Sequence, residues 1–155
     1  CKIISKLNNN TKLYNHYSYN SRDVYVLNNK AENASTYNQS IFYTARNNNI
    51  KTVVLGWKEI SRRYNFDDVS WLYDVEFELL KNCNVDKFIC CGPQKYDIAT
   101  RLKYAKIDEN KIKVFYDLYE AESEIKNSKG DIYAILNFDY VESFNEIMKE
   151  KGKWN

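Results

Sequence analysis

The feature that most constrains the fold of this chain is a regular alternation of strand-like and helix-like segments. Five short runs rich in β-branched and aromatic residues recur along it, separated by helical spacing or turn residues. The expected strands are Asp23–Leu27, Thr52–Trp57, Lys87–Cys91, Lys111–Phe115 and Asp131–Leu136. Because such alternation needs crossover connections, it predicts an α/β domain whose sheet is mostly parallel and covered by helices on both faces.

Helical spacing of apolar residues marks the segments between these strands. The expected helices are Tyr37–Arg46, a run from Asp74 to about Lys81, Gln94–Lys106, Leu118–Asn127 and Val141–Lys149. The strand Thr52–Trp57 is apolar on both faces, which is typical of a buried strand in a parallel sheet.

The N-terminal residues lack this organisation. Residues 1–22 show no sustained hydrophobic period, apart from a possible edge strand at Lys2–Lys6. The chain starts at Cys1 and its one methionine is Met148, so we expect it to be a piece of a longer protein. We therefore expect residues 1–22 to connect to a preceding part of the protein. Residues 23–155 should form one α/β domain, because 155 residues is the usual length of a single domain.

Charge and hydropathy narrow the class of partner. Twenty-three basic residues against twenty-one acidic ones leave a net charge of +2, which gives no electrostatic reason to expect a nucleic acid or an anionic membrane. No apolar run approaches the roughly 20 residues that a membrane-spanning helix needs. Free thiols and the absence of a signal-peptide pattern favour a soluble protein of the cytoplasm.

Motifs for nucleotide or metal chemistry are absent from the sequence. It has no G-x-x-x-x-G-K-[ST] loop, no convincing G-x-G-x-x-G and no C-x-x-C pair, so we expect this domain alone to bind no cofactor and no metal. Cys90 and Cys91 end a predicted strand, but the only histidine, His16, lies in the unpatterned N-terminal segment. A thiol nucleophile needs a base, so buried structural cysteines are the preferred interpretation.

Basic residues gather on one predicted helix. They are Lys95, Arg101, Lys103 and Lys106. This set is compatible with holding a phosphate or a carboxylate, although a solvated basic helix face is the preferred interpretation.

The densest unusual segment is 67–78, which holds five carboxylates and a tryptophan. It follows a predicted buried strand, so we expect it at the carboxyl edge of the sheet, where α/β proteins bind their ligands. A structural alternative is that Asp68 caps a helix while Trp71 and Phe77 anchor it.

Three segments together resemble one family. Asp68-Val-Ser-Trp-Leu-Tyr-Asp-Val-Glu-Phe-Glu78 is similar to the signature D-x-S-W-[LI]-[WY]-D-x-[DE]-F-E of the C-terminal domain of MurT-type Mur ligase-like proteins, the synthetase subunit of lipid II isoglutaminyl synthase. Gly92 to Ala105 resembles G-x-R-x-Y-D-M-A-x-R-L-K-Y-A, and Lys30 to Gln39 more weakly resembles K-N-P-A-G-[FY]-N. The order and spacing of all three segments fit the family.

The resemblance implies a three-layer, Rossmann-like, Mur ligase C-terminal-like domain of an amidotransferase complex in peptidoglycan synthesis. Such a complex uses ATP and Mg²⁺, held by a preceding Mur ligase central domain, to activate the D-glutamate α-carboxylate of lipid II. Ammonia from a GatD-type glutaminase subunit then amidates this carboxylate.

The resemblance also assigns site residues. Asp68 is the aspartate that such families supply to the Cys–His pair of the partner glutaminase, which makes it the expected catalytic residue. The residues expected to support its loop or contact the partner are Ser70, Trp71, Asp74, Glu78 and Asn38.

Two other classes of function remain open from the residues. One is a non-catalytic protein-interaction module of a diverged Mur ligase-like protein, docking a partner through the Trp71 region. The other is a single-stranded RNA binder that uses its 14 tyrosines as stacking platforms. The near-neutral charge counts against the RNA binder.

Overall fold

A six-stranded sheet forms the centre of the computed structural model, which describes residues 14–29, 33–57 and 69–149. The strand order is β1-β2-β6-β3-β4-β5. The strands are β1 (Tyr14–Tyr19), β2 (Arg22–Asn29), β3 (Lys51–Gly56), β4 (Val85–Cys91), β5 (Ile112–Phe115) and β6 (Asp131–Asn137). All neighbouring pairs are parallel except β1 and β2, which are antiparallel. The predicted α/β fold with a mostly parallel sheet is confirmed.

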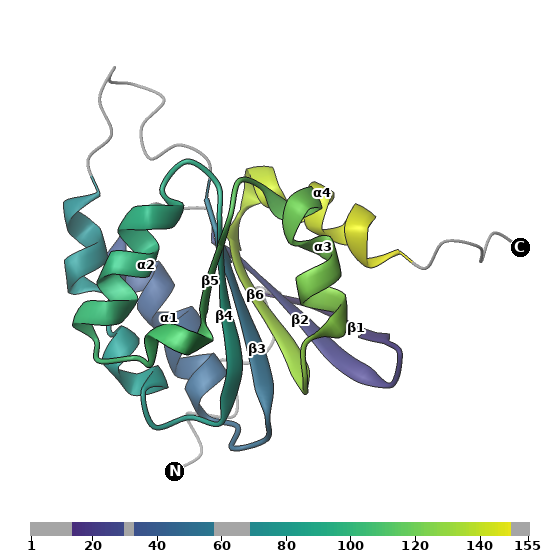
Figure 1. Ribbon diagram of the computed structural model, residues 1–155, viewed down its shortest axis with the longest axis horizontal. Helices are drawn as coiled ribbons and strands as arrows, with labels where there is room; N and C mark the ends of the chain where they lie inside the picture. Colours follow the sequence, from purple (N-terminus) through teal and green to yellow (C-terminus); the bar gives the residue numbers. More distant parts are fainter. Residues whose placement is uncertain (1–13, 30–32, 58–68, 150–155) are drawn as a thin grey trace, which may run out of the picture.

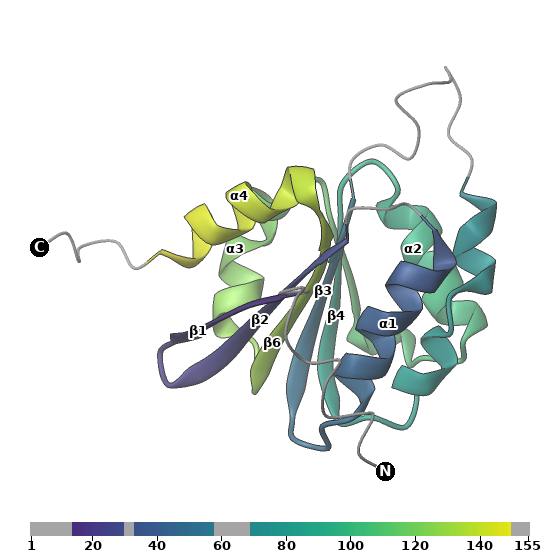
Figure 2. The same ribbon diagram turned by 180° about the vertical axis from the view of Figure 1, so that it is seen from behind.

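Helices cover both faces of this sheet. They are α1 (Ala34–Ala45), η2 (Ser70–Asp74), η3 (Phe77–Leu80), α2 (Lys95–Tyr104), η4 (Glu109–Lys111), α3 (Leu118–Asn127) and α4 (Phe138–Met148). Figure 1 shows α1 and α2 on one side of the sheet and α3 and α4 on the other, and Figure 2 shows the same three layers from behind. None of the helices in the described ranges is long and apolar enough to cross a membrane.

Strand alternation divides the core into two halves. One row of neighbouring side chains packs toward α1 and α2, and it consists of Leu27, Ile135, Leu55 and Cys90. The next row packs toward α3 and α4, and it consists of Val26, Ala134, Val54 and Ile89. Because both faces of the central strands are buried, these strands read as continuous apolar runs in the sequence.

Strand β1 is the main difference from the sequence analysis, which expected no strand between residues 7 and 22. It pairs with β2 through a two-residue turn in which Asn20 and Ser21 have φ of 49° and 61°. Two residues with positive φ are typical of the tight turns that join antiparallel strands, usually through Asn-Gly rather than Asn-Ser. Residues 14–19 therefore belong to the sheet, whereas the edge strand predicted at Lys2–Lys6 lies outside the described residues.

The predicted continuous helix that ends near Lys81 is replaced by two short 3₁₀ turns, η2 and η3. Val75 interrupts them with extended backbone (φ −83°, ψ 128°). The last helix begins at Phe138 rather than at the predicted Val141, directly after β6. The helix Leu118–Asn127 has the predicted bounds, and Asp117 caps it by accepting a hydrogen bond from the Glu120 N–H at 2.9 Å.

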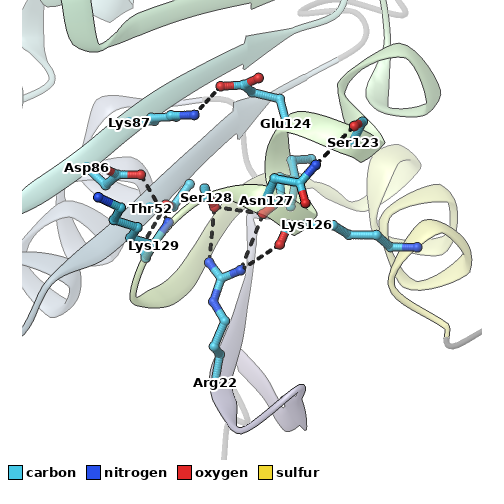
Figure 3. Close-up of polar contacts among 11 residues, drawn as sticks. Arg22, Thr52, Asp86, Lys87, Ser123, Glu124, Lys126, Asn127, Ser128 and Lys129 are labelled. Atoms are coloured by element: carbon cyan, nitrogen blue, oxygen red, sulfur yellow. Dashed lines mark hydrogen bonds and ion pairs between the residues drawn. The ribbon is translucent and has the colours of Figure 1, made fainter.

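Arg22, at the start of β2, connects the amino edge of the sheet to the C-terminal end of α3 (Figure 3). Its Nε donates to the Gly130 carbonyl, Nη1 to the Lys126 carbonyl at 3.2 Å, and Nη2 to the Ser128 hydroxyl at 3.0 Å. A helix end leaves carbonyl groups without helical partners. The guanidinium therefore supplies donors to the loop between α3 and β6.

Candidate functional site

The connection between β3 and β4 forms the candidate site, and we call its residues 69–80 the Trp71 segment. Its inward side chains are Leu72, Val75, Phe77 and Leu80, each no more than 1% exposed. Its outward side chains are Ser70, Tyr73, Asp74, Glu76 and Glu78. The segment packs against α1 and α2 on one side of the sheet (Figures 1 and 2), so these two helices hold its outward side chains in place.

Trp71 belongs to a cluster of three aromatic rings. Its ring stacks on Tyr37 of α1, with centroids 4.8 Å apart and planes at 26°. Trp57, directly after β3, lies 5.0 Å from Tyr37 and 5.7 Å from Trp71. Such offset pairs contribute about 0.5–1.5 kcal/mol each beyond their buried area, so they fix the start of the Trp71 segment against α1 and β3.

Asn38 of α1 holds the middle of the Trp71 segment. Its Nδ2 donates to the Asp74 carbonyl at 3.1 Å, and its Oδ1 accepts from the Glu76 N–H at 2.7 Å. One side-chain amide therefore satisfies a main-chain acceptor and a main-chain donor on either side of Val75. At Val75 the chain leaves η2, so the main-chain groups on either side of this residue do not continue a helical hydrogen-bond pattern.

Arg101 of α2 is the residue that the sequence analysis misjudged. The expectation of a solvated basic face is wrong for it, because it is 5% exposed. Its Nε donates to the Leu72 carbonyl at 3.1 Å and Nη2 to the Val75 carbonyl at 2.7 Å. Its Nη2 also lies 2.8 Å from a Glu78 carboxylate oxygen. Lys103 on the same helix and Lys106 just beyond its end are exposed, as expected.

The contact with Arg101 also sets the ionisation of Glu78. Its hydrogen bond to the guanidinium holds the pKa of this carboxyl below its usual value, outweighing the opposing effect of burial. Glu78 is therefore a carboxylate near neutral pH. It provides the guanidinium with a counter-charge at the surface end of the buried arginine.

The expected catalytic residue, Asp68, lies outside the described residues. In the sequence it precedes Ser70, the first residue of η2, by two positions. The N-cap position of η2 is Val69, and no side-chain cap hydrogen bond is present there.

Cys90 and Cys91 lack the environment of a nucleophilic cysteine. Burial raises the pKa of the Cys90 thiol, and it raises the pKa of Cys91 to about 12. His16 contacts Asp23 at 3.0 Å, at the amino end of β2, whereas both cysteines lie at the carboxyl end of the parallel strand β4. A thiolate is the reactive form, so these residues are structural, in agreement with the preferred interpretation.

Neutral amides occupy the described carboxyl edge of the central strands. The Ser40 hydroxyl donates to the Asn29 side chain at 3.1 Å, and the buried side-chain amide of Asn137 makes no hydrogen bond to the residues that the structure describes. Phosphate sites instead use cations or a cradle of backbone N–H groups. No cluster of three metal-ligating side chains occurs within residues 14–29, 33–57 and 69–149.

All three motifs of the sequence analysis contribute to the same contacts. Tyr37 and Asn38 come from the motif at Lys30–Gln39, the Trp71 segment from the motif that begins at Asp68, and Arg101 from the motif at Gly92–Ala105. The MurT ligase C-terminal family matches residues 31–140, which include all of them. This chain belongs to the MurT ligase C-terminal family.

Two curated relatives of this family member are similar over a shorter stretch. Both are named "Lipid II isoglutaminyl synthase (glutamine-hydrolyzing) subunit MurT", from Staphylococcus aureus strains COL and N315. Each is 35% identical over 71 residues, which is 46% of this chain and 16% of the relative. The aligned part of the chain therefore spans about a sixth of the length of these relatives.

Proposed function

We propose that this chain is the C-terminal domain of the synthetase subunit of a lipid II isoglutaminyl synthase, and that Asp68 completes the catalytic triad of its glutaminase partner. The observation that carries the proposal is that the three motifs shared with the family meet at one place, the Trp71 segment. The segment begins one residue after Asp68 in the sequence and contacts α1 and α2, with Trp71 also packed near Trp57 at the end of β3. That arrangement suits a residue that must be presented to another subunit.

The chemistry assigned to Asp68 follows from the needs of a cysteine nucleophile. A histidine takes the thiol proton, and an aspartate fixes the histidine tautomer and stabilises the imidazolium. In the described part of this chain, His16 lies on β1 whereas Cys90 and Cys91 lie on β4, with three strands between them, so they form no such pair. On this proposal, the chain supplies the third group of the triad and the glutaminase supplies the first two.

ATP and Mg²⁺ belong, in this proposal, to the preceding central domain of the full-length protein. At the carboxyl ends of β2 and β6 the described side chains are the neutral amides of Asn29 and Asn137, which do not fit a phosphate site there. We therefore derive no step of the ATP chemistry from these residues. We propose that lipid II is the substrate of the whole complex and that the complex acts in the cytoplasm.

The experiment is an Asp68→Asn substitution in the full-length subunit, reconstituted with its glutaminase. Asparagine caps a helix almost as well as aspartate, but it is not a charged acceptor. Glutamine hydrolysis should fall by about 10⁴-fold, the loss seen when the aspartate of a triad becomes asparagine, while assembly is retained. Asp108→Asn is the matched control, because Asp108 caps η4 by accepting from the Asn110 N–H at 3.0 Å. Hydrolysis at the wild-type rate in an assembled Asp68→Asn complex would instead favour the non-catalytic interaction module.

A further inference from the structure

Arg101 is buried, yet its guanidinium bonds to main-chain groups of another segment rather than to its own helix. It contacts Leu72 in η2, Val75 in the extended break and Glu78 in η3. Its guanidinium carbon also lies 5.6 Å from the centre of the Phe77 ring. One side chain therefore joins both turns of the Trp71 segment and the break between them.

The base from which Arg101 acts is rigid. Its neighbours on α2, Ile98 and Leu102, are fully buried in the core between the helices and the sheet. Arg101 is therefore held on a helix that packs against the sheet, and its hydrogen bonds hold the Trp71 segment to that helix. Asn38 makes the corresponding link from α1.

The geometry of the contacts explains why arginine is required. A guanidinium is a planar fork that donates from several nitrogens at once, whereas an ammonium is a single point from which three bonds diverge. The Leu72 and Val75 carbonyls accept from two different nitrogens of Arg101, Nε and Nη2. A lysine at this position keeps the charge but not both contacts.

We propose that Arg101 is a positioning residue: it fixes the Trp71 segment, and with it the face formed by Ser70, Tyr73 and Asp74, in the arrangement that glutamine hydrolysis by the partner subunit requires. This inference rests on the proposed function and deepens it. The side chains of this face are all exposed, and Tyr73 is 59% exposed. A shift of Ser70 also moves the attachment point of the residues before it.

The test compares Arg101→Lys with Arg22→Lys in the full-length subunit reconstituted with its glutaminase. Arg22 is a matched control because, like Arg101, it donates from Nε and Nη2 to acceptors of a distant segment, but at the amino edge of the sheet (Figure 3). A small misplacement of a catalytic group costs up to about 10²-fold in rate. We expect Arg101→Lys to lower kcat for glutamine hydrolysis by about 10- to 100-fold with KM within twofold. Arg22→Lys should lower the unfolding temperature comparably and leave kcat within twofold.

A loss of kcat at nearly constant KM in Arg101→Lys, without the same loss in Arg22→Lys, distinguishes a positioning role from a loss of stability. If Arg101→Lys does not fold, Arg101→Gln and Glu78→Ala serve in its place, since the first retains one donor and the second leaves the guanidinium intact. Equal kcat in the Arg101 and Arg22 variants overturns the inference alone, provided that Asp68→Asn abolishes hydrolysis. Wild-type kcat in Asp68→Asn overturns the proposed function together with the inference.

Discussion

Lys51 is a fully buried lysine at the start of β3, and its replacement by methionine tests what stabilises the C-terminal end of α1. Its ammonium donates to the Thr44 carbonyl at 2.7 Å and to the Asn47 carbonyl, and it lies 5.3 Å from the centre of the Tyr133 ring. Helix α1 has no basic residue in its own last turn, so Lys51 supplies the cation that a helix C-terminus favours.

Two effects of opposite sign decide the result. Burial lowers the pKa of Lys51, which means that the protein disfavours its charge, and methionine removes that cost. Against this, methionine leaves two carbonyls without their charged donor, at about 1–3 kcal/mol for each unsatisfied group. The cation–π contact and the helix dipole are lost as well. We expect the losses to dominate, with a net destabilisation of about 2–4 kcal/mol.

Urea unfolding of the chain measures this difference. With an m-value of about 2 kcal/mol per M, the midpoint should fall by about 1–2 M at unchanged m. The control is Lys87→Met, because Lys87 is more exposed and pairs with Glu124 on α3. Such a pair contributes about 0–1 kcal/mol. A Lys51→Met variant as stable as wild type, or no less stable than Lys87→Met, refutes the reasoning.

Two further predictions concern the Trp71 segment and the loop before β6. Because Arg101 depresses the pKa of Glu78, this carboxylate stabilises the fold above its ordinary pKa of 4.5 and loses that contribution as pH falls through the lowered value. The difference in unfolding temperature between wild type and Glu78→Gln should therefore be largest at pH 7 and shrink as the pH falls below 4.5; a constant difference contradicts this linkage. Gly130 has φ +74°, and an added Cβ would lie 2.0 Å from the Ile50 carbonyl oxygen. Gly130→Ala should cost at least about 2 kcal/mol in urea unfolding, whereas Gly56→Ala should cost less, because the nearest atom to its Cβ is in the Leu136 side chain at 3.3 Å.

The parallel core was predictable because its strands carry their own signal. Thr52–Trp57 and Asp131–Leu136 are apolar on both faces, which few structures other than a doubly covered sheet accommodate. Strand β1 was missed because its residues are polar and its turn is Asn20-Ser21, without the glycine that usually marks such a hairpin. Its signal lay in Tyr17 and Tyr19, which alternate and pack against the α3 and α4 side of the core.

The candidate site was predictable as a segment but not as a set of contacts. The density of carboxylates and aromatics singled out residues 67–78, and the family pattern added Asn38. The sequence analysis grouped Arg101 with the lysines around it, although its position carries a sign of burial. A helical position three residues after Ile98 and next to Leu102 is a sign of burial, and a buried arginine needs acceptors nearby. That argument identifies the residue as special, but the identity of the acceptors depends on tertiary structure.

The position of β6 in the sheet has a consequence for how the chain is made. This strand is near the end of the chain, yet it lies between β2 and β3, where Val24 pairs with Ile132 and Thr52 pairs with the same residue from the other side. During synthesis, β2 and β3 therefore remain unpaired on their facing edges until residues 131–137 have been made. Until then both present open, apolar edges of the kind that associate with other chains. We expect a nascent chain that stops before Asp131 to depend on chaperones, and the completed domain to fold slowly for its size because its central contacts are so distant in sequence.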